Sequence, residues 1–235
     1  MQLFYSPDLS KTVISYKFSR EESKHIAKVL RKKEGDLLYI TNGKGSLFTA
    51  ELTLATQSVC QVTLLEHKAY PQKDYYVHLA VAPTKMNDRY EWFLEKATEI
   101  GVDEITPIIC DHSERKVIKP ERLQRILQSA MKQSLQYYLP ILNEAVTFKE
   151  FIKQSHQETN KYIAHCDEVH KDLLKNAIQP KTAVLLLIGP EGDFSKKEIQ
   201  SAMDLGYAPV SLGATRLRTE TAAIVALNSI SFINQ

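Results

Sequence analysis

The stretch LLLIGPEGDFSKKEI, residues 185–199, decides the fold class of this chain. Its apolar run is too short to cross a membrane and is typical of a strand that is buried on both faces. The run breaks into Gly-Pro-Glu-Gly at 189–192, and Ser195 followed three residues later by Glu198 is a capping-box pattern that begins a helix. The stretch therefore predicts a buried strand, a tight loop holding a carboxylate, and a helix.

The same alternation of strand and helix runs from residue 75 to the end of the chain. Strands are predicted at 75–82, 104–110, 161–167, 182–189 and 208–213. Helices are predicted at 88–101, 120–138, 168–178, 195–206 and 219–233. Alternating elements with nearly continuous apolar strands indicate an α/β fold, with a largely parallel sheet covered on both faces.

Residues 1–70 follow a different pattern. A helix is predicted at 21–33, a strand–turn–strand at 37–52 around the Asn-Gly turn at 42–43, and a third strand at 58–67. This strand-rich segment predicts a small β-barrel-type module, joined by a linker at 69–74 to a second domain at 75–235. The module holds ten Lys and Arg against seven Asp and Glu, which weakly favours a polyanionic partner.

The bulk composition predicts a cytoplasmic protein. Hydrophobic residues make up 43% and charged residues 25% of the 235, as in an ordinary globular protein. The three cysteines are far apart and lack CxxC spacing, which indicates a reducing compartment. The N-terminus shows no signal-peptide pattern, and no apolar run is long enough to span a membrane.

A second unusual strand end lies at SLGATRLRTETAA, residues 211–223. Arg216 and Arg218 precede the start of an apolar helix there, an arrangement that favours an anionic partner. Ligands of parallel sheets bind at the carboxyl ends of the strands, so this loop and the loop at 189–192 are candidates for one site. The structural alternatives are an ordinary strand–helix turn and an Arg–Glu pair with a helix cap.

Several site classes are excluded by their missing patterns. The chain has no GxGxxG after the first strand of its second domain, no GxxxxGK[ST] and no GxSxG, which argues against NAD enzymes, P-loop NTPases and α/β-hydrolases. His165, Cys166 and His170 lack a fourth ligand at any zinc spacing, so no metal site is predicted.

Together these segments resemble the RsmE family of ribosomal RNA small subunit methyltransferases, within the SPOUT superfamily. The stretches LLIGPEGDFSKKEI and SLGATRLRTETAAIVAL resemble its two C-terminal signatures. HIAKVLRKKEGD and NGKG resemble its N-terminal module, KMNDRYEWFLEKATEIGVDEITPI its middle motif, and RLQRILQSAMKQSLQYYLPIL its long helix. The resemblance thus covers nearly the whole chain in order.

The resemblance implies a PUA-like RNA-binding β-barrel followed by a SPOUT-type parallel sheet whose end is threaded into a trefoil knot. It further implies a homodimer that binds S-adenosyl-L-methionine without a metal. The expected reaction is methylation of a uridine at N(3) in 16S rRNA within the small ribosomal subunit.

The resemblance and the chemistry of the residues together give candidate site residues. Those expected to bind the cofactor are Ile188, Gly189, Pro190, Glu191, Gly192, Leu212, Gly213, Leu217, Arg218, Thr219, Thr221 and Ala222. The candidates for catalysis are Arg218, which would bind a phosphate or a developing uridine oxyanion, and Glu220, which would steer the proton. The RNA-binding candidates are Arg20, Lys24, Lys28, Arg31, Lys32, Lys85, Arg89 and Arg115.

The sequence departs from the family pattern at three positions. Asp193 stands where the family usually has a second glycine, Thr215 stands at the first arginine of the last signature, and Gln136 stands where a basic residue is common. Two other functions remain open at this point. One is a SPOUT methyltransferase that acts on another RNA position, and the other is a non-catalytic RNA-binding or ribosome-assembly protein.

Overall fold

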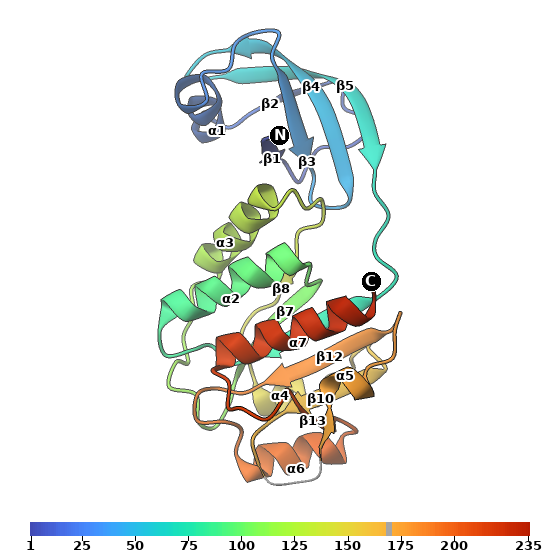
Figure 1. The fold of residues 1–235 in the computed structure, drawn as a ribbon. Helices are drawn as coiled ribbons and strands as arrows, with labels where there is room; N and C mark the ends of the chain where they lie inside the picture. The colour runs from blue at the N-terminus through green and yellow to red at the C-terminus, as the bar shows by residue number, and fades with distance from the viewer. Residues whose placement is uncertain (168–170) are drawn as a thin grey trace. The chain divides into compact units, whose positions relative to one another are not determined.

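The computed structural model describes residues 1–167 and 171–235, which form two compact units. The first unit consists of Met1–Gln72 together with Met131–Leu139 (Figure 1). The second consists of Lys73–Ala130 and Pro140–Gln235. Among the described residues, no helix is both long and apolar enough to cross a membrane.

The first unit is built on a five-stranded sheet in the order β1-β3-β4-β5-β2. Its strands are β1 (Leu3–Tyr5), β2 (Ser15–Lys17), β3 (Leu37–Thr41), β4 (Ser46–Ala55) and β5 (Cys60–Ala69). β1 pairs with β3 in parallel and the other pairs are antiparallel. The three longer strands were predicted from the sequence. The two edge strands were not, because three residues are too few to show a period of two.

One helical segment of the first unit carries many of its basic residues. Ser19 caps it by accepting a hydrogen bond from the Glu22 N–H at 3.2 Å. The α-helix α1 (Arg20–Lys24) continues as the π-helical turn η1 (His25–Val29). The helix predicted at 21–33 therefore ends early, and Arg31 adopts a left-handed backbone with φ of 55°.

The segment 131–139 is hydrogen-bonded to the β3–β4 loop within the first unit. The Gly45 N–H donates to the Tyr137 carbonyl and the Leu139 N–H donates to the Gly43 carbonyl, both at 2.9 Å. The Tyr138 hydroxyl donates to the Tyr70 carbonyl at 2.8 Å. Because their backbone groups pair with this loop, residues after Gln133 cannot extend the helix that the sequence predicted up to residue 138.

The second unit contains an eight-stranded parallel sheet in the order β11-β13-β10-β12-β6-β7-β8, with β9 paired to β7. Its strands are β6 (Tyr76–Val81), β7 (Glu104–Ile109), β8 (Ile141–Leu142), β9 (Val146–Thr147), β10 (Asn160–Ala164), β11 (Asp172–Leu173), β12 (Ala183–Ile188) and β13 (Ala208–Ser211). β6 and β12 are buried along nearly their whole length, as expected for central strands covered on both faces.

Helices cover the two faces of this sheet. They are α2 (Asn87–Ile100), α4 (Phe148–Phe151), α5 (Leu174–Ala177), α6 (Lys196–Asp204) and α7 (Thr219–Ile233). One more helix, α3 (Pro120–Gln133), begins in the second unit, and its residues from Met131 onward belong to the first. α2 and α7 lie side by side over one face (Figure 1). On the other face, Leu185 and Leu187 of β12 pack in one core with Phe151 of α4 and Ile199 of α6. The predicted α/β class with a parallel sheet is therefore confirmed.

The region between β10 and β12 differs from the prediction. The predicted helix 168–178 begins in residues 168–170, which lie outside the described residues. Its described remainder forms the short strand β11 and the single turn of α5. Asp172 and Leu173 pair with Val210 and Ser211 at the sheet edge, so these two residues form a strand where a helix was expected.

Candidate active site

Loops that follow three adjacent strands meet at one edge of the second sheet and enclose a hollow of about 520 Å³. The strands are β10, β12 and β13, and all three run in the same direction. The hollow is lined by Ala164, His165, Cys166, Lys171, Ile188, Gly189, Pro190, Glu191, Asp193, Val210, Ser211, Leu212, Gly213, Ala214, Thr215, Arg216, Leu217, Arg218, Thr219 and Ala222. Its size is that of a small-molecule site, and it lies where such sheets bind ligands.

The loop after β12 is tied into place at both ends. Ser195 caps α6, and its reciprocal hydrogen bonds with Glu198 confirm the predicted capping box. At the other end, the Thr219 hydroxyl donates to the Gly189 carbonyl at 3.0 Å and so joins this loop to the start of α7. A Cβ on Gly189 would lie 3.1 Å from ring carbons of Phe194, which explains the glycine at the turn.

The carboxylate of Glu191 has a structural partner. One of its oxygens accepts a hydrogen bond from the Lys85 N–H at 2.9 Å. The Arg115 guanidinium in turn donates to the carbonyls of Thr84 and Lys85, at 3.1 Å and 2.8 Å. Glu191 therefore links the loop to the segment after β6. Its carboxylate has a structural role, whether or not it also contacts a ligand.

Asp193 holds the loops after β10 and β12 together. Its backbone is left-handed, with φ of 64°, a conformation that glycine adopts more readily. Its two carboxylate oxygens accept hydrogen bonds from the Phe194 N–H at 2.8 Å and the Cys166 N–H at 2.7 Å. The aspartate thus adopts a glycine-like conformation while adding a link that glycine cannot make.

The loop after β13 brings two arginines to the hollow, and they differ in their contacts. Arg216 donates to the Glu191 carbonyl at 3.4 Å, so it spans the two signature loops. Arg218 precedes the first residue of α7 and is exposed. Within the described part of the chain, its guanidinium makes no hydrogen bond or ion pair, so it is available to an anionic or electron-rich ligand.

Glu220 lies in the first turn of α7 and is only 7% exposed. One carboxylate oxygen lies 3.8 Å from Nε of Arg89 on α2. The other is buried and has no hydrogen-bond partner among the described residues. An unpaired buried carboxylate oxygen is costly, and such groups are concentrated at functional sites. Glu220 does not line the hollow itself, although Thr219 before it and Ala222 after it do.

The structure brings together most of the residues expected to bind a cofactor. All of them line the hollow except Gly192 and Thr221. A Cβ on Gly192 would lie 3.0 Å from the Cβ of His112, which does not line the hollow either. The structure therefore does not place Gly192 in the wall of the hollow.

Comparison with known proteins identifies the family. The sequence profile of the RNA methyltransferase domain family matches residues 71–231, and that of the RNA methyltransferase PUA domain matches residues 18–65. The chain belongs to the RsmE family of RNA methyltransferases. The two units therefore correspond to a PUA-like module and a SPOUT methyltransferase domain.

Individual relatives support the same assignment. Ribosomal RNA small subunit methyltransferase E from Buchnera aphidicola is 28% identical over 222 residues, covering 92% of this chain and 87% of that protein. The structure of a probable rRNA-methyltransferase from Porphyromonas gingivalis has a TM-score of 0.92 at 42% identity, with 100% and 98% of the two chains covered. The S-adenosyl methionine complex of the Neisseria gonorrhoeae methyltransferase E has a TM-score of 0.87 at 26% identity, with 100% and 98% covered.

Sequence reasoning missed the third wall of the hollow in this RsmE-family chain. It is formed by Ala164, His165, Cys166 and Lys171, which follow β10. His165 is buried, both its ring nitrogens lack hydrogen-bond partners among the described residues, and burial together with Lys171 lowers its pKa. The available signal was that β10 is a third parallel strand ending at the same edge as β12 and β13.

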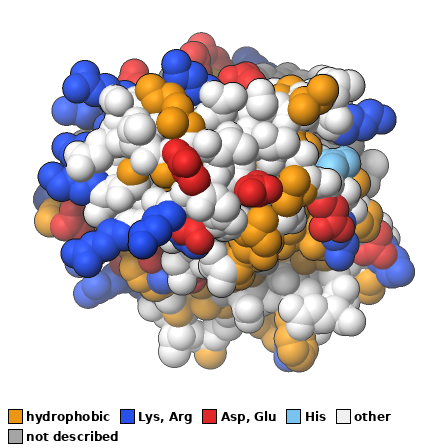
Figure 2. Space-filling view, turned by 90° about the horizontal axis from the view of Figure 1, so that it is seen from above, with side chains coloured by type: hydrophobic (Ala, Val, Ile, Leu, Met, Phe, Trp, Pro, Cys, Tyr) orange, Lys and Arg blue, Asp and Glu red, His pale blue; other side chains and the backbone are white. Residues whose placement is uncertain are grey.

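The RNA-binding candidates separate into two groups. Arg20, Lys24 and Lys28 are exposed and line a shallow hollow of the first unit, and Arg31 is exposed nearby in sequence. In Figure 2, Lys and Arg side chains gather along the left margin of the face that is drawn. Lys32 is half-buried.

The candidates of the second unit already have partners. Lys85 pairs with Glu114 at 2.8 Å, and Arg89 lies near Glu220. Arg115 is bound to the two backbone carbonyls after β6. Of the RNA-binding candidates, those without an ion pair or side-chain hydrogen bond among the described residues therefore belong to the first unit.

Proposed function

We propose that this chain transfers a methyl group from S-adenosyl-L-methionine to N(3) of a uridine in 16S rRNA of the small ribosomal subunit. The observation that carries the proposal is the hollow in which both RsmE signature loops meet. The methyltransferase E of Neisseria gonorrhoeae, which shares this fold, is bound to S-adenosyl methionine.

The hollow fits an elongated ligand that has both apolar and polar parts. Ile188, Val210, Leu212 and Leu217 supply apolar walls, and the backbone groups of the two signature loops supply hydrogen-bonding edges. The bound cofactor would supply an activated methyl group on a sulfonium, so that the C–S bond breaks as the N–C bond forms. The protein then has to align the two reactants and exclude water from them.

The transfer also requires removal of the proton from uridine N(3). Arg218 would stabilise the negative charge that develops on the uridine oxygens, because its guanidinium is exposed beside the hollow and has no partner in the described chain. Glu220 would accept the proton through its unpaired oxygen, directly or through one water molecule. The competing interpretation is that Arg89 and Glu220 form only a structural pair.

The Glu220→Gln variant separates these two interpretations. We expect turnover to fall about 100-fold, the scale of a lost general base, with a change in the pH profile of the rate. Stability should not fall, because the uncharged amide removes a buried charge that has only one distant partner. The matched variant Arg89→Ala removes the ion pair but keeps the carboxylate, so it should retain most of the turnover. An unchanged rate and pH profile in Glu220→Gln would leave Glu220 with the structural role alone.

The first unit would hold the RNA. Lys and Arg grip phosphates and give affinity that depends on salt but not on sequence. Specificity would then come from the shape of the rRNA around an exposed base. We propose that the basic residues of α1, η1 and the following turn make these contacts.

Two measurements on the purified protein test the proposed function. Calorimetry in the presence of chelator should show binding of S-adenosyl-L-methionine. Small subunits from cells that lack the enzyme should then accept one methyl group, recovered as N(3)-methyluridine. Recovery at another base would favour a different RNA position, and cofactor binding with no transfer to any RNA would favour a ribosome-assembly protein.

A further inference from the structure

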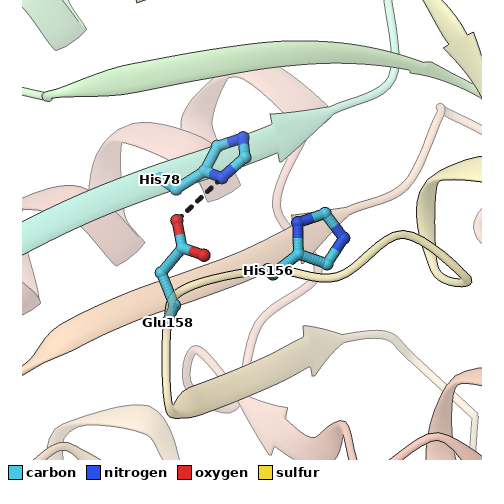
Figure 3. Close-up of side chains that lie close together, drawn as sticks. All are labelled: His78, His156 and Glu158. Atoms are coloured by element: carbon cyan, nitrogen blue, oxygen red, sulfur yellow. Dashed lines mark hydrogen bonds and ion pairs between the residues drawn. The ribbon is translucent and has the colours of Figure 1, made fainter.

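His78, His156 and Glu158 gather on the face of the second sheet that also carries α4 (Figure 3). His78 is the third residue of β6, and the other two precede β10. His78 pairs in register with Leu185, three residues before the end of β12, so about 10 Å of strand separates it from the hollow. One ligand atom from each side chain lies within 4.8 Å of the other two.

Among the described residues, His156 is hydrogen-bonded through one ring nitrogen, whereas His78 is hydrogen-bonded through both. Nε2 of His156 lies 2.8 Å from the Phe151 carbonyl, which can only accept, so this nitrogen carries the proton and Nδ1 carries the lone pair. Nε2 of His78 lies 2.7 Å from the Thr106 hydroxyl, and its Nδ1 donates to the Glu158 carboxylate at 3.0 Å. To bind a metal through Nδ1, His78 has to adopt the other tautomer, in which Nε2 carries the proton and donates to the Thr106 hydroxyl. Oxygen partners that orient the second nitrogen are characteristic of histidines that ligate metals.

The polar side chains of the cluster lie in a largely buried, nonpolar environment. His78 and Glu158 are 3% and 5% exposed, and the His78 ring packs edge-on against Phe151. Glu158 has His78 as its partner in this environment, and a cation would further compensate the charge of the buried carboxylate.

We propose that His78, His156 and Glu158 bind a divalent transition-metal ion, with Zn²⁺ the best match. Two histidines and one carboxylate are a known zinc ligand set, with a fourth position open to water. Ligand atoms around tetrahedral zinc lie about 3.3 Å apart, so the cluster must contract on binding. Residues 152–159 form no helix or strand, so the His156 side chain can move inward.

The role assigned to this metal is structural. It would fasten the segment before β10 to β6 and Thr106 of β7, away from the loops that form the hollow. No sequence pattern indicated the cluster, because His78 and Glu158 are separated by 80 residues. The alternative is that the three side chains form only a hydrogen-bonded network.

Metal titration of the chelator-treated full-length protein tests the proposal. One equivalent of Co²⁺ should produce the visible absorption of a tetrahedral site, and Zn²⁺ should displace it. At a Zn²⁺ concentration 100-fold above Kd, the unfolding temperature should rise by roughly 5–10 °C. Affinity for S-adenosyl-L-methionine should stay the same with or without zinc.

Two variants locate the site. His156→Gln keeps a donor for the Phe151 carbonyl and leaves the His78–Glu158 contact in place, and it should lose the Co²⁺ spectrum and the zinc-dependent shift. His67→Gln removes an exposed histidine of the first unit and should retain both. Absence of stoichiometric binding to the wild type, or equal binding by His156→Gln, would overturn the metal site. The melting curve without metal shows whether each variant is folded.

Discussion

At the scale of single residues, Asp193 shows how a departure from the family pattern is accommodated. The left-handed backbone at this position explains why glycine is common there. Asp193 adopts the same conformation and offsets its strain with hydrogen bonds to Phe194 and Cys166. Compared with glycine, Asp193 is less free to adopt this backbone conformation, but its side chain links the loops after β10 and β12.

Replacing Asp193 by alanine should destabilise the protein more than replacing it by glycine. Both changes remove the two hydrogen bonds, at a cost of roughly 1–3 kcal/mol, because donors are left unpaired. Alanine also retains the left-handed strain, which adds about 1 kcal/mol relative to glycine. Urea unfolding of the two variants tests this order, and an alanine variant as stable as the glycine variant would contradict it.

Arg218→Ala should depress turnover far more than RNA affinity. The guanidinium makes no described contact within the chain, so its removal should leave folding intact and cost about 100-fold in the rate. Arg218→Lys keeps the charge and should recover part of the rate. Single-turnover transfer to small subunits measures both variants. Full turnover in Arg218→Ala would remove this residue from the catalytic centre.

At the scale of elements, strands and helices with a strong period were predictable. Apolar runs predicted the strands β6, β7, β10, β12 and β13. Amphipathic or apolar helical patterns predicted α2, α6 and α7. The segments that failed depend on distant partners. α3 stops at Gln133 because its continuation bonds to the β3–β4 loop, and residues 172–173 pair with β13 instead of forming a helix.

The candidate site, like the elements, was only partly predictable from the sequence. The two loops with unusual composition were found, but the wall after β10 was missed because its residues carry no motif. The contact between Gly192 and His112 could not be predicted either, because the two residues are 80 positions apart in the sequence. The partners of Glu191 and Arg115 likewise become visible only when β6 and β12 lie side by side.

The basic turn after η1 should contribute to RNA binding through charge alone. Arg31→Gln with Lys32→Gln should weaken binding to small-subunit RNA and reduce the slope of log K against log salt by about 0.7–0.9 for each phosphate that is no longer neutralised. Cofactor affinity should not change, because these residues belong to the first unit. Lys149→Gln with Lys153→Gln, an equal charge change on the second unit, is the control.

Filter binding over a range of salt concentrations measures this effect. If the double variant at Arg31 and Lys32 bound as tightly as the wild type at every salt concentration, the docking of RNA on the first unit would fail.

At the scale of the whole molecule, we propose that the two units have different functions. We assign RNA binding to the first unit and methyl transfer to the second. The first unit also includes residues 131–139, so each unit is built from two separate segments of the sequence. No local pattern reveals this arrangement, because it rests on hydrogen bonds between the segments 43–45 and 137–139.

We also predict a homodimer, as the family resemblance implies. The sequence 120–138 offers five apolar side chains for such an interface, namely Leu127, Ala130, Met131, Leu135 and Tyr138. The first three are buried within the chain, whereas Leu135 is exposed. Trp92 and Phe232 of the second unit are exposed as well. Light scattering at micromolar concentration should give twice the chain mass, and a clean monomer would contradict the prediction.

The central claim is that this chain methylates N(3) of a uridine in 16S rRNA. The most direct measurement is mass spectrometry of 16S rRNA nucleosides from cells with and without the protein. We predict the loss of one N(3)-methyluridine in its absence and its return when the wild-type protein, but not Arg218→Ala, is supplied. An unchanged set of methylated nucleosides in 16S rRNA would contradict the claim.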